Sequence, residues 1–203
     1  MAAAPPAPGF GTDTAEFLVW KPLLARAVVS AVFGLVTIFW REPSTSVMSL
    51  AGGLYLVLSG VAYLWTHRMV HRGASSKLLT SIGGGLLLGA GIASLAVVDD
   101  RSFAFAGALA LVVAGLAELA RGLAVRGHAA ARDFVVVGAV GLVTGVILPF
   151  VEDLGAHALL GVTGGGALLT AVVLGIAALT YRHDSALIQP LASGTRGEPD
   201  PVN

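Results

Sequence analysis

Apolar residues fill six long stretches of this chain, and short polar segments separate them. The first two stretches lie within Leu23 to Leu64, where the polar turn REPSTS joins two runs that each approach twenty residues. At about 1.5 Å rise per residue, such a run crosses a hydrocarbon core about 30 Å thick as a helix. The pattern predicts a membrane-spanning hairpin, and the rest of the chain repeats it twice.

The whole pattern predicts an all-α polytopic integral membrane protein, with six transmembrane helices as three repeated hairpins. The expected domain covers residues 21–182, with spans at about 22–40, 47–65, 78–98, 103–120, 134–150 and 159–181. Segments 1–20 and 183–203 are rich in Ala, Pro, Gly or polar residues, and we expect both to be disordered cytoplasmic tails. The first segment lacks the basic and then apolar pattern of a signal peptide.

Composition agrees with lipid as the solvent of these helices. Of the 203 residues, 56% are hydrophobic and 12% charged, about half the charged share of ordinary soluble domains. The lipid bilayer is therefore the expected partner, and a homo-oligomer or a second membrane protein stays open. A net charge of zero gives no reason to expect nucleic acid. The absence of cysteine excludes disulfides and thiol catalysis.

Matched glycines indicate an internal repeat of the hairpin. In the odd spans Gly34 aligns with Gly89 and Gly141, and in the even spans Gly60 aligns with Gly115 and Gly175. Within the hairpins these glycines are 26, 26 and 34 residues apart, which predicts eight extra residues in the third hairpin, near 152–157. All hairpins enter from one side, so the repeat is parallel, unlike the inverted repeats of many transporters.

Glycines also form GxxxG pairs, which are typical of close helix packing in membranes. The glycine-rich stretches lack the lysine and the spacing of a phosphate-binding loop. The expected helix-packing positions are Gly34, Gly60, Gly85, Gly89, Gly115, Gly141, Gly145 and Gly175.

Basic residues predict the orientation, because cytoplasmic segments carry an excess of Lys and Arg. Ten lie on the side of the two chain ends, and two, Arg41 and Arg101, lie on the other side. Both termini should therefore be cytoplasmic. The ten are Lys21, Arg26, Arg68, Arg72, Lys77, Arg121, Arg126, Arg132, Arg182 and Arg196.

Arg26 and Glu118 are charged residues within the expected spans, where a charge costs at least about 2.5 kcal/mol on insertion scales. Arg26 can extend to the interface, contact an ion or substrate, or pair with Glu118. Glu118 can also pair with Arg121, three residues later on its own helix. The sharper hypothesis is an intramembrane charge pair, Arg26 with Glu118, between the first and fourth helices.

Histidines offer little chemistry in this pattern. His67 and His71 are four residues apart, a spacing that suits two metal ligands, but they alternate with arginines and better fit a basic end that attracts anionic lipid. His157 lies among outer acids and is expected to be solvated. We expect no catalytic, metal or cofactor site, and the chain is not expected to be an enzyme.

The first hairpin resembles the HdeD-type acid-resistance membrane proteins of bacteria. The resemblance is carried by Arg26, the run FGLVTIFW ending at Trp40, and the run AGGLYLVLSGVAYL ending at Leu64. Family members often have a proline directly after the aromatic residue, whereas here Arg41 and Glu42 precede Pro43. The resemblance implies a multi-pass protein of the bacterial inner membrane, linked in some members to survival of acid, and supplies no catalytic residues.

Two functional hypotheses follow. The leading one is a non-enzymatic membrane protein that contributes to acid or envelope stress tolerance. The alternative is a small transporter or channel subunit, or a structural partner in a membrane complex, for which glycine-rich helices are favourable and the nearly uncharged middle of the spans is unfavourable.

Overall fold

A computed structural model of the chain describes residues 20–69, 74–124 and 129–194. The elements are α1 (Trp20–Phe39), α2 (Thr45–Met69), α3 (Ala74–Ala96), α4 (Asp100–Ala124), α5 (Ala129–Ile147), the short 3-10 turns η2 (Leu148–Phe150) and η3 (Glu152–Leu154), and α6 (Gly155–Gly194). No strand occurs in these ranges, and all six α-helices are long and apolar enough to cross a membrane. The predicted all-α, six-span fold is confirmed.

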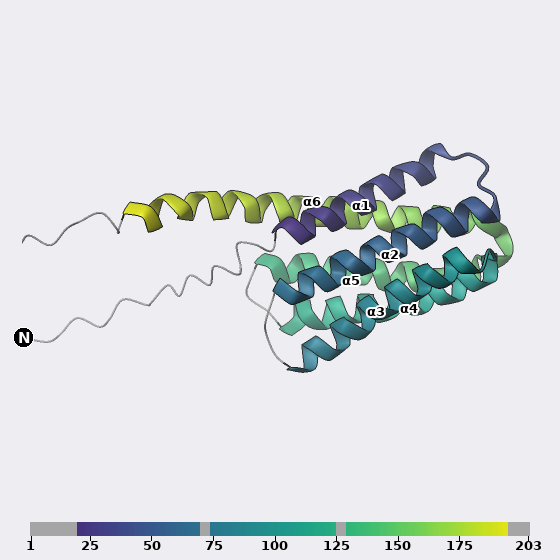
Figure 1. Cartoon of the computed structure of the whole chain (residues 1–203), viewed down its shortest axis with the longest axis horizontal. Helices are drawn as coiled ribbons and strands as arrows, with labels where there is room; N and C mark the ends of the chain where they lie inside the picture. The colour runs from purple at the N-terminus through teal and green to yellow at the C-terminus, as the bar shows by residue number, and fades with distance from the viewer. Residues whose placement is uncertain (1–19, 70–73, 125–128, 195–203) are drawn as a thin grey trace, which may run out of the picture.

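The helices run alternately in opposite directions (Figure 1). The turns that join α1 to α2, α3 to α4, and α5 to α6 lie at one end of the bundle, which we call the turn end. The opposite end contains the start of α1 and the residues Lys21, Arg121 and Arg182, and we call it the basic end. Each pair of helices joined at the turn end is one hairpin.

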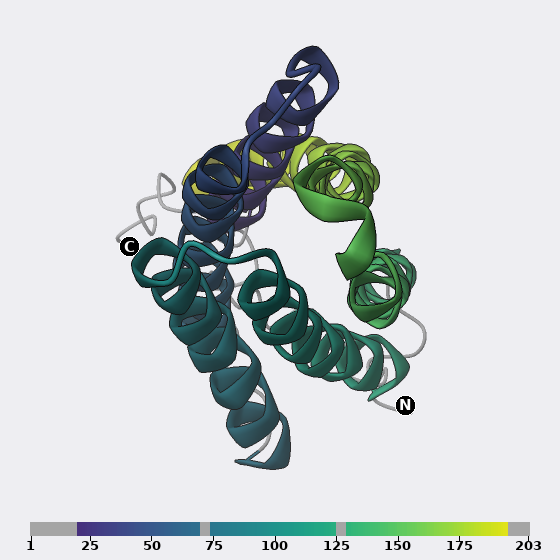
Figure 2. The same ribbon diagram turned by 90° about the vertical axis from the view of Figure 1, so that its right-hand side faces the viewer.

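The even-numbered helices lie inside the bundle and the odd-numbered helices outside. The three even helices contact one another, and each odd helix packs between two even ones. Figure 2, a view along the helices, shows this arrangement. Accordingly, α2, α4 and α6 bury 56, 50 and 44% of their span residues, against 33, 39 and 28% for α1, α3 and α5. The inner helices therefore determine the centre of the molecule.

Large apolar side chains are exposed on every helix, which is the surface that lipid tails would cover. One from each helix in chain order gives Val32, Leu58, Ile92, Leu109, Val143 and Ile176. In water this much apolar surface would be unfavourable by about 25 cal/mol per Å². The exposed belt therefore agrees with the composition in assigning the chain to a membrane.

Three equivalent crossings connect the hairpins around the ring. At each one, a glycine of an outer helix approaches the carbonyl group of a small residue on an inner helix of the neighbouring hairpin. A Cβ atom on that glycine would lie 3.0, 2.7 or 2.9 Å from the carbonyl oxygen in the pairs Gly34–Gly164, Gly91–Gly53 and Gly145–Ala108. Only a residue without a side chain allows such an approach without displacement. The threefold repeat is thus present in the packing.

The register of this repeat corrects the alignment expected from the sequence. Gly34 corresponds in its contacts to Gly91 and Gly145, and not to Gly89 and Gly141. On the inner helices the contact partners Gly53, Ala108 and Gly164 correspond to one another, and this register aligns Gly60 and Gly115 with Ala171 instead of Gly175. The spacings within the hairpins become 26, 24 and 26 residues, so the third hairpin has no eight-residue insertion. Four residue types dominate these helices, so matching letters do not determine which glycine reaches a neighbour.

Five of the expected packing glycines lie at helix contacts and three do not. A Cβ on Gly34, Gly60, Gly115, Gly141 or Gly145 would meet atoms of another helix. Gly85, Gly89 and Gly175 have nothing within 4 Å of that position, so the expectation for these three is corrected. A GxxxG spacing places two glycines on one face of a helix, but it does not say whether that face meets another helix.

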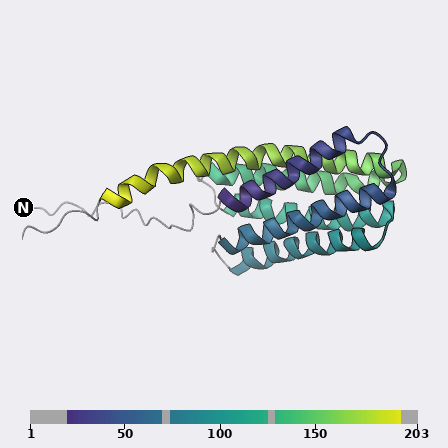
Figure 3. The same cartoon turned by 45° about the horizontal axis from the view of Figure 1, so that its top comes forward.

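The last helix also differs from expectation. A loose tail was expected from residue 183, yet α6 continues to Gly194 and extends beyond the other helices (Figure 3). The end of an apolar run marks the end of a span, whereas a helix continues into polar residues because each added residue costs little once the helix exists. Residues 1–19 and 195–203, where the remaining tails were expected, lie outside the described ranges.

At the turn end, a side-chain cap stabilises the turn between α3 and α4. The Asp99 side chain accepts hydrogen bonds from the backbone N–H and the hydroxyl of Ser102, both at 2.8 Å, and so caps the start of α4. These two bonds favour the charged carboxylate and lower the pKa of Asp99. A tight, capped turn here fixes how α3 and α4 diverge from one another.

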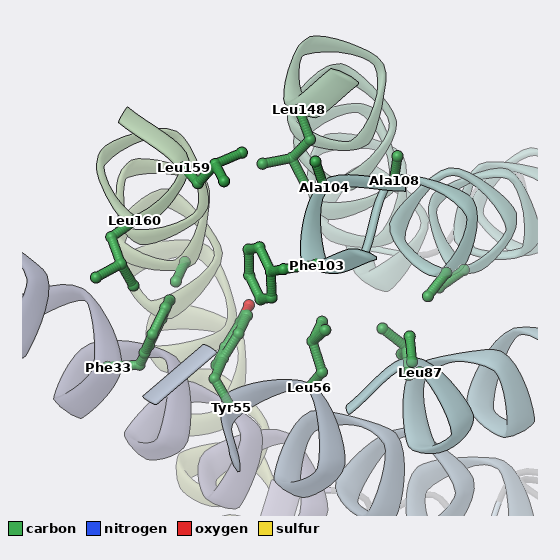
Figure 4. Close-up of a cluster of buried hydrophobic side chains, with 14 of the residues drawn as sticks. Phe33, Tyr55, Leu56, Leu87, Phe103, Ala104, Ala108, Leu148, Leu159 and Leu160 are labelled. Atoms are coloured by element: carbon green, nitrogen blue, oxygen red, sulfur yellow. The ribbon is translucent and has the colours of Figure 1, made fainter. Parts of the chain in front are cut away.

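Equivalent positions of the inner helices meet in layers at the centre. Met48, Phe103 and Leu159 occupy the same repeat position on α2, α4 and α6, and each has 0% exposure. We call these three residues the apolar layer. Figure 4 shows the side chains of Phe103, Leu148 and Leu159 directed into the same space between their helices. The bundle is therefore closed by aliphatic and aromatic contacts on its turn-end side.

Candidate functional site

Arg26 and Glu118 form a salt bridge between an outer and an inner helix. Arg26 lies on α1 and Glu118 on α4; Nη1 contacts Oε1, and Nη2 donates to Oε2 at 3.4 Å. Their side chains are 12 and 2% exposed. The structure thus brings together the two residues of the expected intramembrane charge pair. Two hydrogen bonds between the same groups also fix the orientation of the guanidinium plane.

Tyr63 of α2 supports the pair from a third helix. Its ring lies under the Arg26 guanidinium, 5.1 Å from Cζ to the ring centroid, and its hydroxyl donates to the Ala114 carbonyl at 3.3 Å. A cation over an aromatic face is attracted by the negative charge density of the ring. The site therefore connects α1, α2 and α4 through one buried charge pair.

The pair breaks the threefold repeat. Tyr63, Glu118 and Leu174 occupy equivalent positions on the three inner helices, and all three are buried. The outer-helix positions equivalent to Arg26 are Gly83 and Val137. Of the three equivalent positions on the inner helices, only that of Glu118 therefore carries a carboxylate. Of the three equivalent positions on the outer helices, only that of Arg26 carries an arginine, which neutralises Glu118. Packing alone does not need this asymmetry, which makes the pair the first candidate for function.

Polar groups continue from the pair toward the middle of the bundle. Tyr55, Ser59 and Tyr63 follow one another at intervals of four on one face of α2, and Ser30 lies one turn from Arg26 on α1. The Tyr55 ring stacks on Phe33 with centroids 4.3 Å apart and an 8° angle between the planes. We call the six residues of this continuous set the polar column: Arg26, Ser30, Tyr55, Ser59, Tyr63 and Glu118.

Basic and aromatic side chains surround the basic end. Arg121 lies over the ring of Phe134 at 4.3 Å from its centroid, while remaining close enough to Glu118 for electrostatic attraction. Glu118 takes Arg26 as its salt-bridge partner, although Arg121 lies nearer in the sequence. Lys21 and Arg182 each lie 5.7 Å from the centroid of Trp20. Such aromatic and basic residues are typical of the headgroup level of a bilayer.

The remaining histidines and charges do not form a second site in the described ranges. His71 and the side chain of His67 lie outside what the structure describes. His157 is exposed and lines a groove of about 380 Å³ with Thr37, Gly161 and Gly165. At the turn end Arg101 and Glu152 are 3.9 Å apart, with Arg101 75% exposed. No group of three metal-ligating side chains occurs among the described residues.

Sequence reasoning missed Tyr55, Tyr63 and Ser30 as members of the site. The signal was available, because Tyr55, Ser59 and Tyr63 follow at intervals of four and so share one face of α2. Ser30 likewise follows Arg26 by one helical turn. A polar stripe on an otherwise apolar span indicates a side that faces protein and not lipid.

The sequence matches no protein-family model, and no curated protein and no solved structure is significantly similar to it. The class of the protein therefore follows from its own fold and site. It is a multi-pass, all-α integral membrane protein with six spans and a buried Arg–Glu pair in its interior.

Proposed function

We propose that this chain is a non-enzymatic protein of the bacterial inner membrane that contributes to tolerance of acid or envelope stress. The resemblance of its first hairpin to HdeD-type proteins supports the proposal. Arg26, one of the residues that carry the resemblance, is also the residue that the bundle buries against Glu118. An intramembrane ionisable pair is by default a functional feature, and this pair is the observation on which the proposal rests.

The proposed orientation places the basic end in the cytoplasm. Its support is the excess of Lys and Arg on the side of the chain ends. Glu118 then lies nearer to the cytoplasmic water than to the outside. Acid reaching the cytoplasm would meet the basic end before the apolar layer.

Survival of acid tests the proposal. In the host bacterium, deletion of the gene should lower survival of a dense culture at low pH, and the wild-type gene should restore it. Glu118→Gln should restore it poorly at equal protein level in the membrane, because a neutral partner leaves the buried Arg26 charge unbalanced. Glu152→Gln removes a half-buried carboxylate at the turn end, 3.9 Å from the exposed Arg101, and serves as the matched control. Unchanged survival after deletion would contradict the stress role.

A further inference from the structure

Two hydroxyl groups of the polar column are buried without a hydrogen-bond partner among the described residues. Ser30 is 0% exposed and Ser59 4%, and neither Oγ makes a hydrogen bond of normal geometry. Ser59 lies one helical turn from Tyr55 on α2, and Ser30 lies nearly one turn from Phe33 on α1, the residue whose ring stacks on Tyr55. The three hydroxyl-bearing side chains therefore lie in one buried region of the contact between α1 and α2.

Unpaired hydroxyls inside a lipid-embedded bundle are unfavourable. A buried water stabilises such a site when two to four polar groups can bond to it. Ser30, Ser59 and Tyr55 supply that number of groups. The charged pair lies next in the column, and Arg121, half-buried at the basic end, is close enough to interact with Glu118 and Tyr63. Polar groups thus connect these hydroxyls to the surface.

On the other side the column meets the apolar layer. Met48, Phe103 and Leu159 are fully buried, and they offer no hydrogen-bonding side chain except the weak thioether of Met48. The ring of Phe103 lies directly on Gly52, where a Cβ would be 2.7 Å from Cζ. A tight apolar constriction excludes water by dewetting, as in hydrophobic channel gates.

We propose that the polar column is hydrated and forms the half of a path for water and protons that opens toward the basic end, with the apolar layer closing it. Protons enter on water at the basic end, exchange among water and the hydroxyl and carboxyl groups, and leave by the same end. Net transfer across the membrane requires an opening of the layer at Phe103. This inference is independent of the stress role, because it concerns conduction by the isolated protein.

Proton flux into proteoliposomes tests the closure. With a potassium gradient and valinomycin as the driving force and pyranine inside, the wild type should match protein-free vesicles. Phe103→Ala should raise the rate several-fold, and adding Ser30→Ala and Ser59→Ala should return it toward the wild type. Phe105→Ala removes a lipid-exposed ring from the same helix and should change nothing. A wild type that conducts, or a folded Phe103→Ala that does not, overturns the closure.

Thiol accessibility tests the hydration without disturbing the layer. The chain has no cysteine, so single cysteines report cleanly on their surroundings. In nanodiscs, Ag⁺ should react with Ser59→Cys and Ser30→Cys, which are conservative changes, and so block maleimide labelling of these cysteines carried out after the protein is denatured. It should leave Leu58→Cys, one residue away on the exposed face, and Leu159→Cys, in the apolar layer, open to labelling. Equal reactivity of Ser59→Cys and Leu58→Cys overturns the proposal.

Discussion

Glu118 has two arginines near it, and the structure assigns it to the one that is far away in the sequence. Arg121 is three residues along the same helix, yet it packs on Phe134, while Arg26 reaches in from α1. The sequence identified both charges but left their pairing open, because the spacing on one helix says nothing of how a second helix is rotated. The Tyr63 ring under Arg26 gives this pair an additional favourable contact.

Charge replacement should distinguish this buried pair from an exposed one. Arg26→Gln and Glu118→Gln should each destabilise the protein by about 3–5 kcal/mol, because each leaves the other charge buried and unpaired. The exchange Arg26→Glu with Glu118→Arg should recover part of the loss. Thermal unfolding in detergent and the amount of protein in the membrane measure both effects.

The pair of Arg101 and Glu152 at the turn end provides the control for that experiment. Arg101→Gln should cost no more than about 1 kcal/mol, since Arg101 is 75% exposed and lies 3.9 Å from the carboxylate, and ion pairs with an exposed member contribute little. A similar loss at both pairs, or an exchange at the buried pair that rescues nothing, would argue against a direct interaction between Arg26 and Glu118.

The helices were predictable as elements, whereas their contacts were not. Apolar runs of span length identified all six, since backbone groups in lipid must bond within a helix. The rotation of each helix about its own axis could not be predicted, because an apolar span presents similar residues to lipid and to the other helices. The choice between Gly89 and Gly91 illustrates this: both are helical glycines on α3, and only Gly91 meets α2.

Alanine at these two glycines should have opposite effects. Gly91→Ala places a Cβ 2.7 Å from the Gly53 carbonyl oxygen and the Val57 backbone nitrogen, so α2 and α3 must separate, at about 1–3 kcal/mol for an overpacked contact. Gly89→Ala meets no atom within 4 Å and should be neutral or stabilising by up to about 1 kcal/mol through helix propensity. Thermal unfolding of both in one detergent compares them. Equal destabilisation would contradict the observed register.

The arrangement of the entire bundle places all three hairpin turns at one end. The inner position of α2, α4 and α6 is a tertiary property, and the sequence does not reveal it because odd and even spans are about equally hydrophobic. The sequence did carry the threefold repeat, although in a register shifted by two to four residues. Orientation in the membrane depends on the charge difference between the two ends.

Cysteine labelling in intact cells measures this orientation. Asp153→Cys at the turn end and His183→Cys beyond the last span are both at exposed positions. With the basic end in the cytoplasm, a membrane-impermeant maleimide should label Asp153→Cys in intact cells and label His183→Cys only after the membrane is opened. The reverse pattern would invert the proposed topology.

The separation of Arg26 and Glu118 by 92 residues has a consequence for biogenesis. Helices enter the bilayer in the order of their synthesis, so α1 arrives before α4 exists. At 5–20 residues per second, translation needs on the order of ten seconds to supply the carboxylate. During that interval the arginine stays near the headgroups or beside the insertion machinery, and α1 settles into its final depth only after the second hairpin has joined it.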